Sequence, residues 1–147
     1  MPIQEAAFKK VVSTNFEDTD AEIVAITVSV NENITAGDVV RVRVAGSHGF
    51  VEKADDTGTG MFGIAMTTGA IAGNIDVLQF GIQSVNFESS ITLGDTDVGK
   101  DVFVGPSSGR ATLTAPTTSG KKVIKLGYLY DTTGKCYVEP QTIVSIS

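Results

Sequence analysis

Alternation of apolar and polar residues dominates the chain from residue 22 onward. Between residues 22 and 30, every second position is valine or isoleucine. Between residues 40 and 44, valines alternate with Arg41 and Arg43, so the valines would face a core and both arginines would face solvent. A period of two with many β-branched residues is typical of strands. The pattern therefore predicts two strands in this part of the chain.

The same rhythm continues to the C-terminus, and no stretch shows a convincing helical stripe. Turn-forming residues separate the apolar segments at intervals of roughly 8 to 12 residues, which is the spacing of an antiparallel sandwich or barrel. Residues 67–74 are the best place for one short helix. We therefore predict an all-β, antiparallel β-barrel or β-sandwich, with the strand order left open. The further predicted strands are residues 50–54, 61–66, 75–80, 82–87, 101–104, 110–114, 123–130, 135–139 and 142–146.

A short phrase occurs twice in the chain. Residues 34–38 read Ile-Thr-Ala-Gly-Asp and residues 91–95 read Ile-Thr-Leu-Gly-Asp, and a β-rich stretch and a glycine-centred turn follow each copy. Recurrence of several elements in one order indicates a duplicated unit. We expect two similar β-units, at about residues 34–88 and 91–146, within a single β domain of residues 22–147.

The first 21 residues are less patterned and are predicted to form an N-terminal arm. The segment could contact a neighbouring subunit, or it could supply the first strand of the chain's own barrel, because domain termini are often tied into sheets. Its apolar anchors are Ile3, Phe8, Val11, Val12 and Phe16.

Composition excludes several classes of function. The 147 residues suit one compact domain, and the formal charge of −6 with no dense Lys/Arg cluster argues against binding to nucleic acid. The apolar runs are short and interrupted, so neither a membrane span nor a signal peptide is expected. Cys136 is the only cysteine, which makes an internal disulfide impossible and favours a buried strand residue.

Two glycine patterns imitate enzyme motifs. Residues 105–109 match G-x-S-x-G, but a nucleophile elbow requires a helix after the serine, and a strand is predicted there. A triad would also have to recruit His48, the only histidine. Residues 58–63 match G-x-G-x-x-G without the preceding strand and following helix of a dinucleotide site. We interpret both as turns, and a hydrolase acting through Ser107 is not expected.

The acidic loop residues Asp95, Asp97 and Asp101 offer oxygen atoms that Ca²⁺ could use. Their spacing does not match an EF-hand loop, so solvated loop charge and a structural cation both remain open. We assign no catalytic, cofactor-binding or metal-binding residue, and the chain is not predicted to be an enzyme.

The order of these phrases resembles the small decoration, or cement, proteins of tailed-bacteriophage heads. The matching phrases are residues 34–39, which open a β-unit, the Gly-apolar-Ala segment at residues 63–65, and the glycine bend at residues 72–74. The resemblance spans residues 22–146, and the second copy departs from it at Leu93 and at residues 127–129. It implies a β-barrel or β-tulip-like fold and no cofactor.

The resemblance also implies partners and a location. Such proteins bind the major capsid protein on the outer surface of an assembled head, typically as homotrimers, after synthesis in the host cytoplasm, and they stabilise the shell. The expected contacts are those of the arm, together with Arg41 and Arg43. The alternative hypothesis is a phage or cell-surface binding module that recognises a glycan or receptor through the glycine-rich loops at residues 45–50, 55–60 and 105–110.

Overall fold

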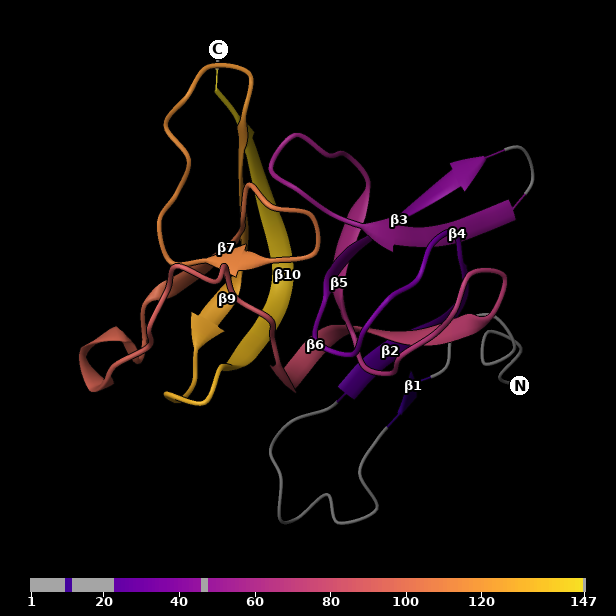
Figure 1. Cartoon of the computed structure of the whole chain (residues 1–147), viewed down its shortest axis with the longest axis horizontal. Helices are drawn as coiled ribbons and strands as arrows, with labels where there is room; N and C mark the ends of the chain where they lie inside the picture. Colours follow the sequence, from indigo (N-terminus) through magenta and orange to yellow (C-terminus); the bar gives the residue numbers. More distant parts are fainter. Residues whose placement is uncertain (1–9, 12–22, 46–47, 147) are drawn as a thin grey trace.

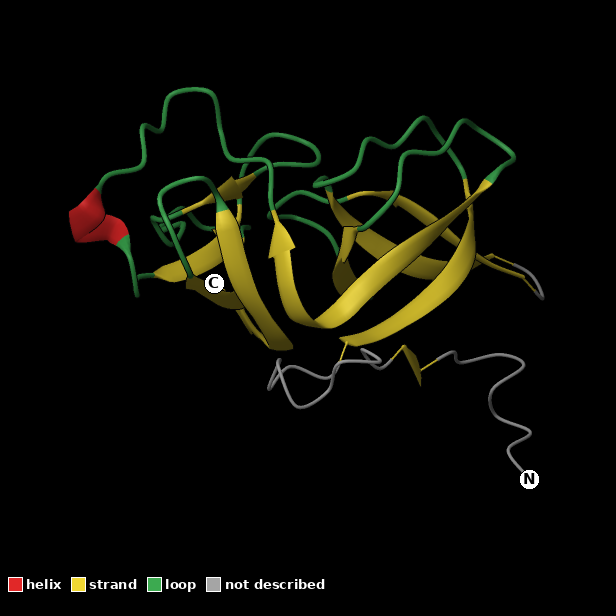
Figure 2. Cartoon of the chain, turned by 90° about the horizontal axis from the view of Figure 1, so that it is seen from below, coloured by secondary structure: helices red, strands yellow, loops and turns green. Residues whose placement is uncertain are grey.

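The computed structural model of this chain describes residues 10–11, 23–45 and 48–146. Within these ranges the fold is all-β: the strands form one curled, mainly antiparallel sheet with a barrel-like shape (Figures 1 and 2). The described ranges contain no α-helix, and their helical turn is the 3₁₀ segment η2, Asp95–Asp97.

The sheet has ten strands in the order β1-β2-β4-β3-β5-β6-β10-β9-β7-β8. Their bounds are β1 Lys10–Val11, β2 Ile23–Val30, β3 Val39–Ala45, β4 His48–Lys53, β5 Met61–Ala65, β6 Asn74–Ser84, β7 Asp101–Val104, β8 Ala111–Thr112, β9 Lys122–Leu129 and β10 Lys135–Ser145.

Strands β2 to β6 close on themselves, and we call them the first set. The hairpin β3–β4 pairs through β3 with β5, β5 pairs with β6, and β6 pairs along its length with β2. A short parallel pairing of β2 with β4, at Ser29 with Phe50 and Val30 with Val51, completes the ring. The buried residues that cluster here are Val30, Ile34, Val40, Val51, Ala65, Ile75 and Val77.

Strands β7, β8, β9 and β10 repeat the pairings of β3, β4, β5 and β6. We call them, together with the end of β6, the second set. Here β7 pairs with β8 and β9, and β9 pairs with β10. The last residues of β6 pair with β10, and a parallel bridge joins Phe87 to Ala111 of β8. Strand β6 therefore belongs to both sets, and Figure 1 shows it crossing from the magenta half of the molecule into the orange and yellow half.

The registers of the two sets correspond up to a shift between Val102 and Phe103, which only the second set contains. In the first set Val39 lies opposite Ile64, and Ile64 lies opposite Leu78. In the second set Asp101 lies opposite Tyr128, and Tyr128 lies opposite Tyr137. We call Val39, Ile64 and Leu78 the first row, and their counterparts Asp101, Tyr128 and Tyr137 the tyrosine row.

A glycine stands beside each row at a position where the strands approach closely. A Cβ atom added to Gly63 would lie 2.6 Å from the carbonyl oxygen of Leu78, and one added to Gly127 would collide with the carbonyl oxygen of Tyr137. Leu78 and Tyr137, which carry these carbonyls, are counterparts of each other in the two sets. The spacing of β5 from β6, and of β9 from β10, therefore requires glycine at both positions.

The turns that precede the hairpins β3–β4 and β7–β8 also correspond. The second of these turns does not lie in the repeated pentad at residues 91–95. The N–H of Gly37 donates to Ala65 O and the N–H of Gly99 donates to Leu129 O, both at 2.8 Å. Their φ angles are +93° and +90°. The counterpart of Gly37 is therefore Gly99, five residues beyond the Gly94 of the second pentad, because η2 is inserted before β7.

The main core lies between the two sets. One buried cluster contains five residues of the first set together with residues of the second set and its connections. The part of the first set's outer surface that carries these five residues is thus covered by the second set. The first-set members are Val39, Ala54, Phe62, Ile64 and Leu78, and the others are Val85, Val102, Val104, Ala111, Ile124, Leu126, Leu129, Cys136 and Val138.

Three features differ from the sequence-based expectations. Residues 75–87 and 135–146 were each expected to contain two strands, yet β6 and β10 run on through Gly81 and Pro140. Gly81 has φ +135° and stays within the ladder, while the register of β10 shifts between Val138 and Thr142. The short helix at residues 67–74 is absent, because this segment is tied down by a bridge between Gly69 and Ile34.

Candidate interaction surface

Polar contacts lock the two sets together at three points. The side-chain amide of Asn86 donates to Asp38 Oδ1 at 3.0 Å and to Ala36 O at 3.2 Å. Lys121 Nζ lies 2.8 Å from Oδ1 of Asp56, a carboxylate that is almost fully buried. These groups, drawn from positions far apart in the sequence, hold the two sets as one body.

The third point is the turn at residues 105–109, which joins β7 to β8. Gly109 O accepts the N–H of Val39 at 2.9 Å, and the N–H of Gly109 donates to Ala54 O at 2.8 Å. The N–H of Ser107 donates to Glu88 Oε2 at 2.9 Å. The G-x-S-x-G segment is therefore a turn between strands, as its sequence context predicts, and the structure shows that it contacts the first set.

The G-x-G-x-x-G segment is likewise a turn, and it leads into β5. Lys122 Nζ donates to Gly58 O at 2.9 Å, and Arg41 donates to Thr59 O at 3.2 Å. Asp55 accepts the N–H of Thr57 at 2.9 Å. The loops at residues 55–60 and 105–110 are thus hydrogen-bonded to neighbouring segments of the fold.

The acidic residues near η2 interact with lysines. Asp97 lies 2.7 Å from Lys100 Nζ and accepts the N–H of Gly94. The Lys100 hydrogen bond, followed by that from Gly94, holds the pKa of Asp97 below its usual range. Asp101 pairs with Lys125 at 3.2 Å. Among the described residues, no group of three or more His, Cys, Asp or Glu side chains is placed to hold a metal ion.

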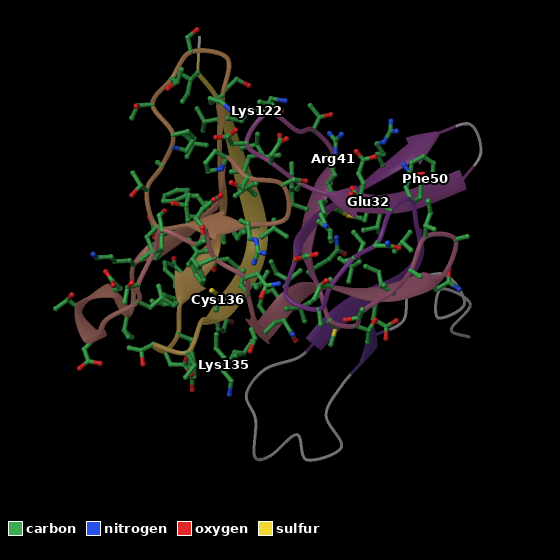
Figure 3. The ribbon with its side chains drawn as sticks, in the orientation of Figure 1. Glu32, Arg41, Phe50, Lys122, Lys135 and Cys136 are labelled. Carbon is green, nitrogen blue, oxygen red and sulfur yellow. The ribbon has the colours of Figure 1, made fainter. Side chains whose placement is uncertain are left out.

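Cys136 is a core residue of the second set, and Figure 3 places it in the other half of the molecule from Arg41 and Phe50. Burial raises the pKa of its thiol to about 12. Because the thiolate is the nucleophilic form, a thiol with this pKa is unreactive near neutral pH.

Arg41 and Arg43, predicted as partner contacts, both bind Glu52 within the chain. Arg41 reaches Glu52 Oε2 at 2.7 Å and Arg43 reaches Oε1 at 2.6 Å. Burial acts to raise the pKa of Glu52, but its bonds to the two arginines outweigh that effect and lower the pKa. The Arg43 guanidinium also lies 5.1 Å from the centre of the Phe50 ring. Arg43 is 46% exposed and remains able to meet a partner.

Of the predicted arm, residues 1–21, the structure describes only Lys10 and Val11. Val11 lies in β1, whose backbone pairs with the start of β2. Ile3, Phe8, Val12 and Phe16 lie outside the described residues. The contacts proposed for them stay predictions.

A surface that the sequence analysis missed is centred on the tyrosine row. Tyr128 is 37% exposed and Tyr130, two positions further along the extended chain, is 54% exposed on the same side. Tyr137 packs edge-to-face against Phe80 with ring centres 5.8 Å apart. All three tyrosines of the chain therefore lie together. We call this surface, completed by Asp101, the tyrosine face.

A lysine at the centre of the tyrosine face orders its polar groups. Lys125 Nζ lies 4.2 Å from the centre of the Tyr128 ring, 3.2 Å from Asp101 and 3.9 Å from Glu139. Burial acts to lower the pKa of Lys125, but the interactions with Tyr128 and Asp101 outweigh that effect and raise the pKa. Tyr128 and Tyr130, two residues apart at the end of one predicted strand, were the signal that could have located this face.

No protein-family model matches the chain, and no curated protein is significantly similar to it. In the described part of the chain, no helix is long and apolar enough to cross a membrane. Interpretation of function therefore depends on the chain's own geometry and on the resemblance described above.

Proposed function

We propose that this protein is a structural decoration protein that binds the outer surface of an assembled phage head and stabilises it, and that its two strand sets are copies of one β-unit. The observation that carries the proposal is the common register of the two sets. It relates Val39 to Asp101, Ile64 to Tyr128 and Leu78 to Tyr137 through two consecutive strand pairings in each set.

Other correspondences support duplication. The parallel closure recurs, since the N–H of Asn31 donates to Val51 O and the N–H of Glu88 donates to Ala111 O, both at 2.9 Å. Gly63 and Gly127 abut carbonyls of counterpart residues. Independent folds would not be expected to share topology, register and glycine placement. Duplicated β-units are also what the resemblance to head decoration proteins implies.

The chemistry of the described residues is consistent with a scaffold. The prominent ionic groups, such as Asp56 with Lys121 and Glu52 with its two arginines, stabilise the fold. The thiol of Cys136 is buried. Binding that occurs only on an assembled shell stabilises the shell by mass action, and contacts at several points add to one another.

In this proposal the partner is the major capsid protein in its assembled form, and the protein acts as a homotrimer on the outer surface of the virion. The test is cosedimentation of the purified chain with undecorated tailed-phage heads and, separately, with free major capsid subunits. We expect binding to heads, retention of free subunits in the supernatant, and heads that survive heating better when decorated. Equal or no binding to the two forms would reject the proposal.

A further inference from the structure

The hairpins β3–β4 and β7–β8 separate at different points. In the first set the pairing continues until the N–H of Ala54 donates to Val39 O at 2.9 Å. In the second set the last pair is Phe103 with Thr112. Thr114 corresponds to Ala54 by count, but its N–H donates to Thr112 Oγ1 at 3.3 Å. The start of β7 therefore lacks the hairpin partner that the start of β3 possesses.

A cleft of about 480 Å³ opens where β8 leaves β7, and we call it the second-set cleft. It lies between the end of β8, the segment at residues 88–92 and the residues that precede β7. The acidic groups of its walls already have partners: Asp97 pairs with Lys100, and Glu88 Oε2 accepts the N–H of Ser107. The remaining walls include hydroxyl and aliphatic side chains, namely Ser90, Ile91, Thr92, Leu113 and Thr114.

Leu113, a wall residue of the second-set cleft, has an unpaired N–H. The described residues supply no hydrogen-bond partner for it. In the first set the N–H of its counterpart, Lys53, donates to Glu32 Oε2 at 2.9 Å. Ser89 stands one residue after the closing bond of the second set, as Glu32 does in the first, and its hydroxyl makes no such bond. A donor that the first set satisfies is thus left open in the second.

The backbone of Asp101 is in a similar position. The carbonyl of Lys100 accepts an N–H from the end of β9 at 2.9 Å, so the next residue, Asp101, directs its N–H and C=O away from β9. The segment after β8 has turned away from that side. Both groups of the counterpart Val39 are bonded: its N–H donates to Gly109 O, and its C=O accepts the N–H of Ala54.

The first set shows what satisfies such groups. A glycine turn from the other β-unit is inserted there, because Gly109 accepts the N–H of Val39 and donates to Ala54 O at 2.8 Å. One residue of the turn thus bridges the start of β3 and the end of β4. Gly109 has φ +81°, and a Cβ atom at this position would lie 3.2 Å from Cδ of Lys53. The bridge requires a donor and an acceptor on one small residue, which the backbone of glycine supplies.

We propose that the second-set cleft is a docking site for a glycine turn of a partner protein, which binds through its backbone to Asp101 and Leu113. The turn accepts their N–H groups and donates to Asp101 O, while Ile91 and Leu113 contact it with their side chains. The chain's own turn at residues 105–109 is bonded to its first set, so a second copy has no free turn of this sequence. The inference rests on the duplication part of the proposed function and is independent of the shell partner.

The first experiment titrates the full ¹⁵N-labelled chain with a synthetic peptide of residues 104–111, closed into a hairpin by a disulfide between two added terminal cysteines. We expect amide shifts at Asp101, Leu113 and Thr114 that approach saturation at a peptide concentration of about 5 mM. A second peptide carries Gly109→Val, which removes the freedom of the glycine. It should bind at least about fivefold more weakly.

Variants with a filled cleft locate the binding. Thr92→Trp and Ser90→Trp place a large ring on exposed wall residues and should each weaken peptide binding by about tenfold or more. The matched control is Thr96→Trp, which changes an exposed residue of η2 that does not line the cleft and should leave binding unchanged. Far-UV circular dichroism verifies that all three variants fold.

Two results would overturn the inference. One is the absence of shifts at Asp101 and Leu113 throughout the titration, and the other is an equal loss of binding in Thr92→Trp and Thr96→Trp. Glucose, galactose and N-acetylglucosamine are titrated separately. Shifts of the same amides with a sugar but not with the peptide would assign the cleft to carbohydrate and reject the protein partner.

Head binding of the same variants separates this inference from the proposed function. If the peptide binds the cleft but the chain does not bind heads, the inference stands and the decoration function is rejected. If heads are bound and the peptide is not, the decoration function stands and this inference is wrong.

Discussion

The first and second strand sets share their pairings and differ in the side chains on one outer surface. Ile64 and Tyr128 occupy the same position in the same register, yet one is fully buried and the other is partly exposed. The strand frame does not account for that difference, because it is common to both. The position of each set in the chain accounts for it: the first set carries the second, and nothing in the described chain is placed upon the second.

The comparison separates two kinds of requirement in the two strand sets. Residues that are alike in both sets, such as Gly63 and Gly127, reflect the geometry of the unit. Residues that differ at counterpart positions reflect what each unit contacts. The following predictions test this division, beginning with the largest expected effect.

The paired glycines should be indispensable in both sets. In Gly63→Val and Gly127→Val the new side chain would be forced against the carbonyls of Leu78 and Tyr137, so we expect losses of about 3 kcal/mol or more in the free energy of unfolding. Denaturant unfolding measures this. The control Gly99→Ala has open space around its Cβ and only its φ of +90° to oppose it, so it should cost about 1 kcal/mol. Comparable losses in all three variants would contradict the close-approach argument.

Counterpart positions in the two rows should respond unequally to truncation. Ile64→Ala creates a cavity between the sets and should cost about 2–5 kcal/mol, whereas Tyr128→Ala should cost less than about 1 kcal/mol in the monomer. Urea unfolding at a protein concentration low enough to prevent association provides the measurement. A Tyr128→Ala cost equal to that of Ile64→Ala would show that the tyrosine row is structural.

The core position of Cys136 should accept the residue found at its counterpart, Val77. Because the volume is nearly conserved, we expect Cys136→Val to change stability by less than about 1.5 kcal/mol. In the native wild-type chain the thiol, with its pKa raised to about 12, should resist a thiol reagent at pH 8 and react fully in denaturant. Rapid labelling of the native protein would place Cys136 outside the core.

The Glu52 cluster should make a small, pH-dependent contribution that only the first set possesses. The folded pKa of Glu52 is lowered, so its contribution is present above its ordinary pKa and is lost as the pH falls through about 4 and below. Glu52→Gln should therefore be less stable than the wild type at pH 7 and nearly equal to it at pH 3. Thermal melts at both values provide the check, and a difference that persists at pH 3 would argue against the ionic interpretation. Partial exposure and salt screening keep the effect small.

The sequence was sufficient to predict the all-β class and the position of most strands, because alternation and turn residues are local signals. It failed where distant residues decide the outcome. Gly81 and Pro140 read as strand breakers, yet pairing to neighbouring strands carries β6 and β10 through them. Gly94 matched Gly37 by local sequence, while the bond to Leu129 shows that Gly99 takes that role.

The candidate surface was harder to predict than the fold. Arg41 and Arg43 were correctly expected on an outward face, but their common partner Glu52 lies on the neighbouring strand and could not be assigned from spacing alone. The tyrosine face depends on the alignment of β9 with β10, which brings Tyr128 beside Tyr137. Such cross-strand neighbours depend on the register between two strands, and the register cannot be read from the sequence of either strand alone.

Strand β6 gives the molecule a property that a simple tandem of domains lacks. Its first part pairs with β2 and completes the ring of the first set, and its last part pairs with β10. The two sets therefore share one strand. Deleting the first set would remove the strand with which β10 pairs, and deleting the second would expose the buried Val39, Ile64 and Leu78. The two sets therefore depend on each other, and neither is expected to fold alone.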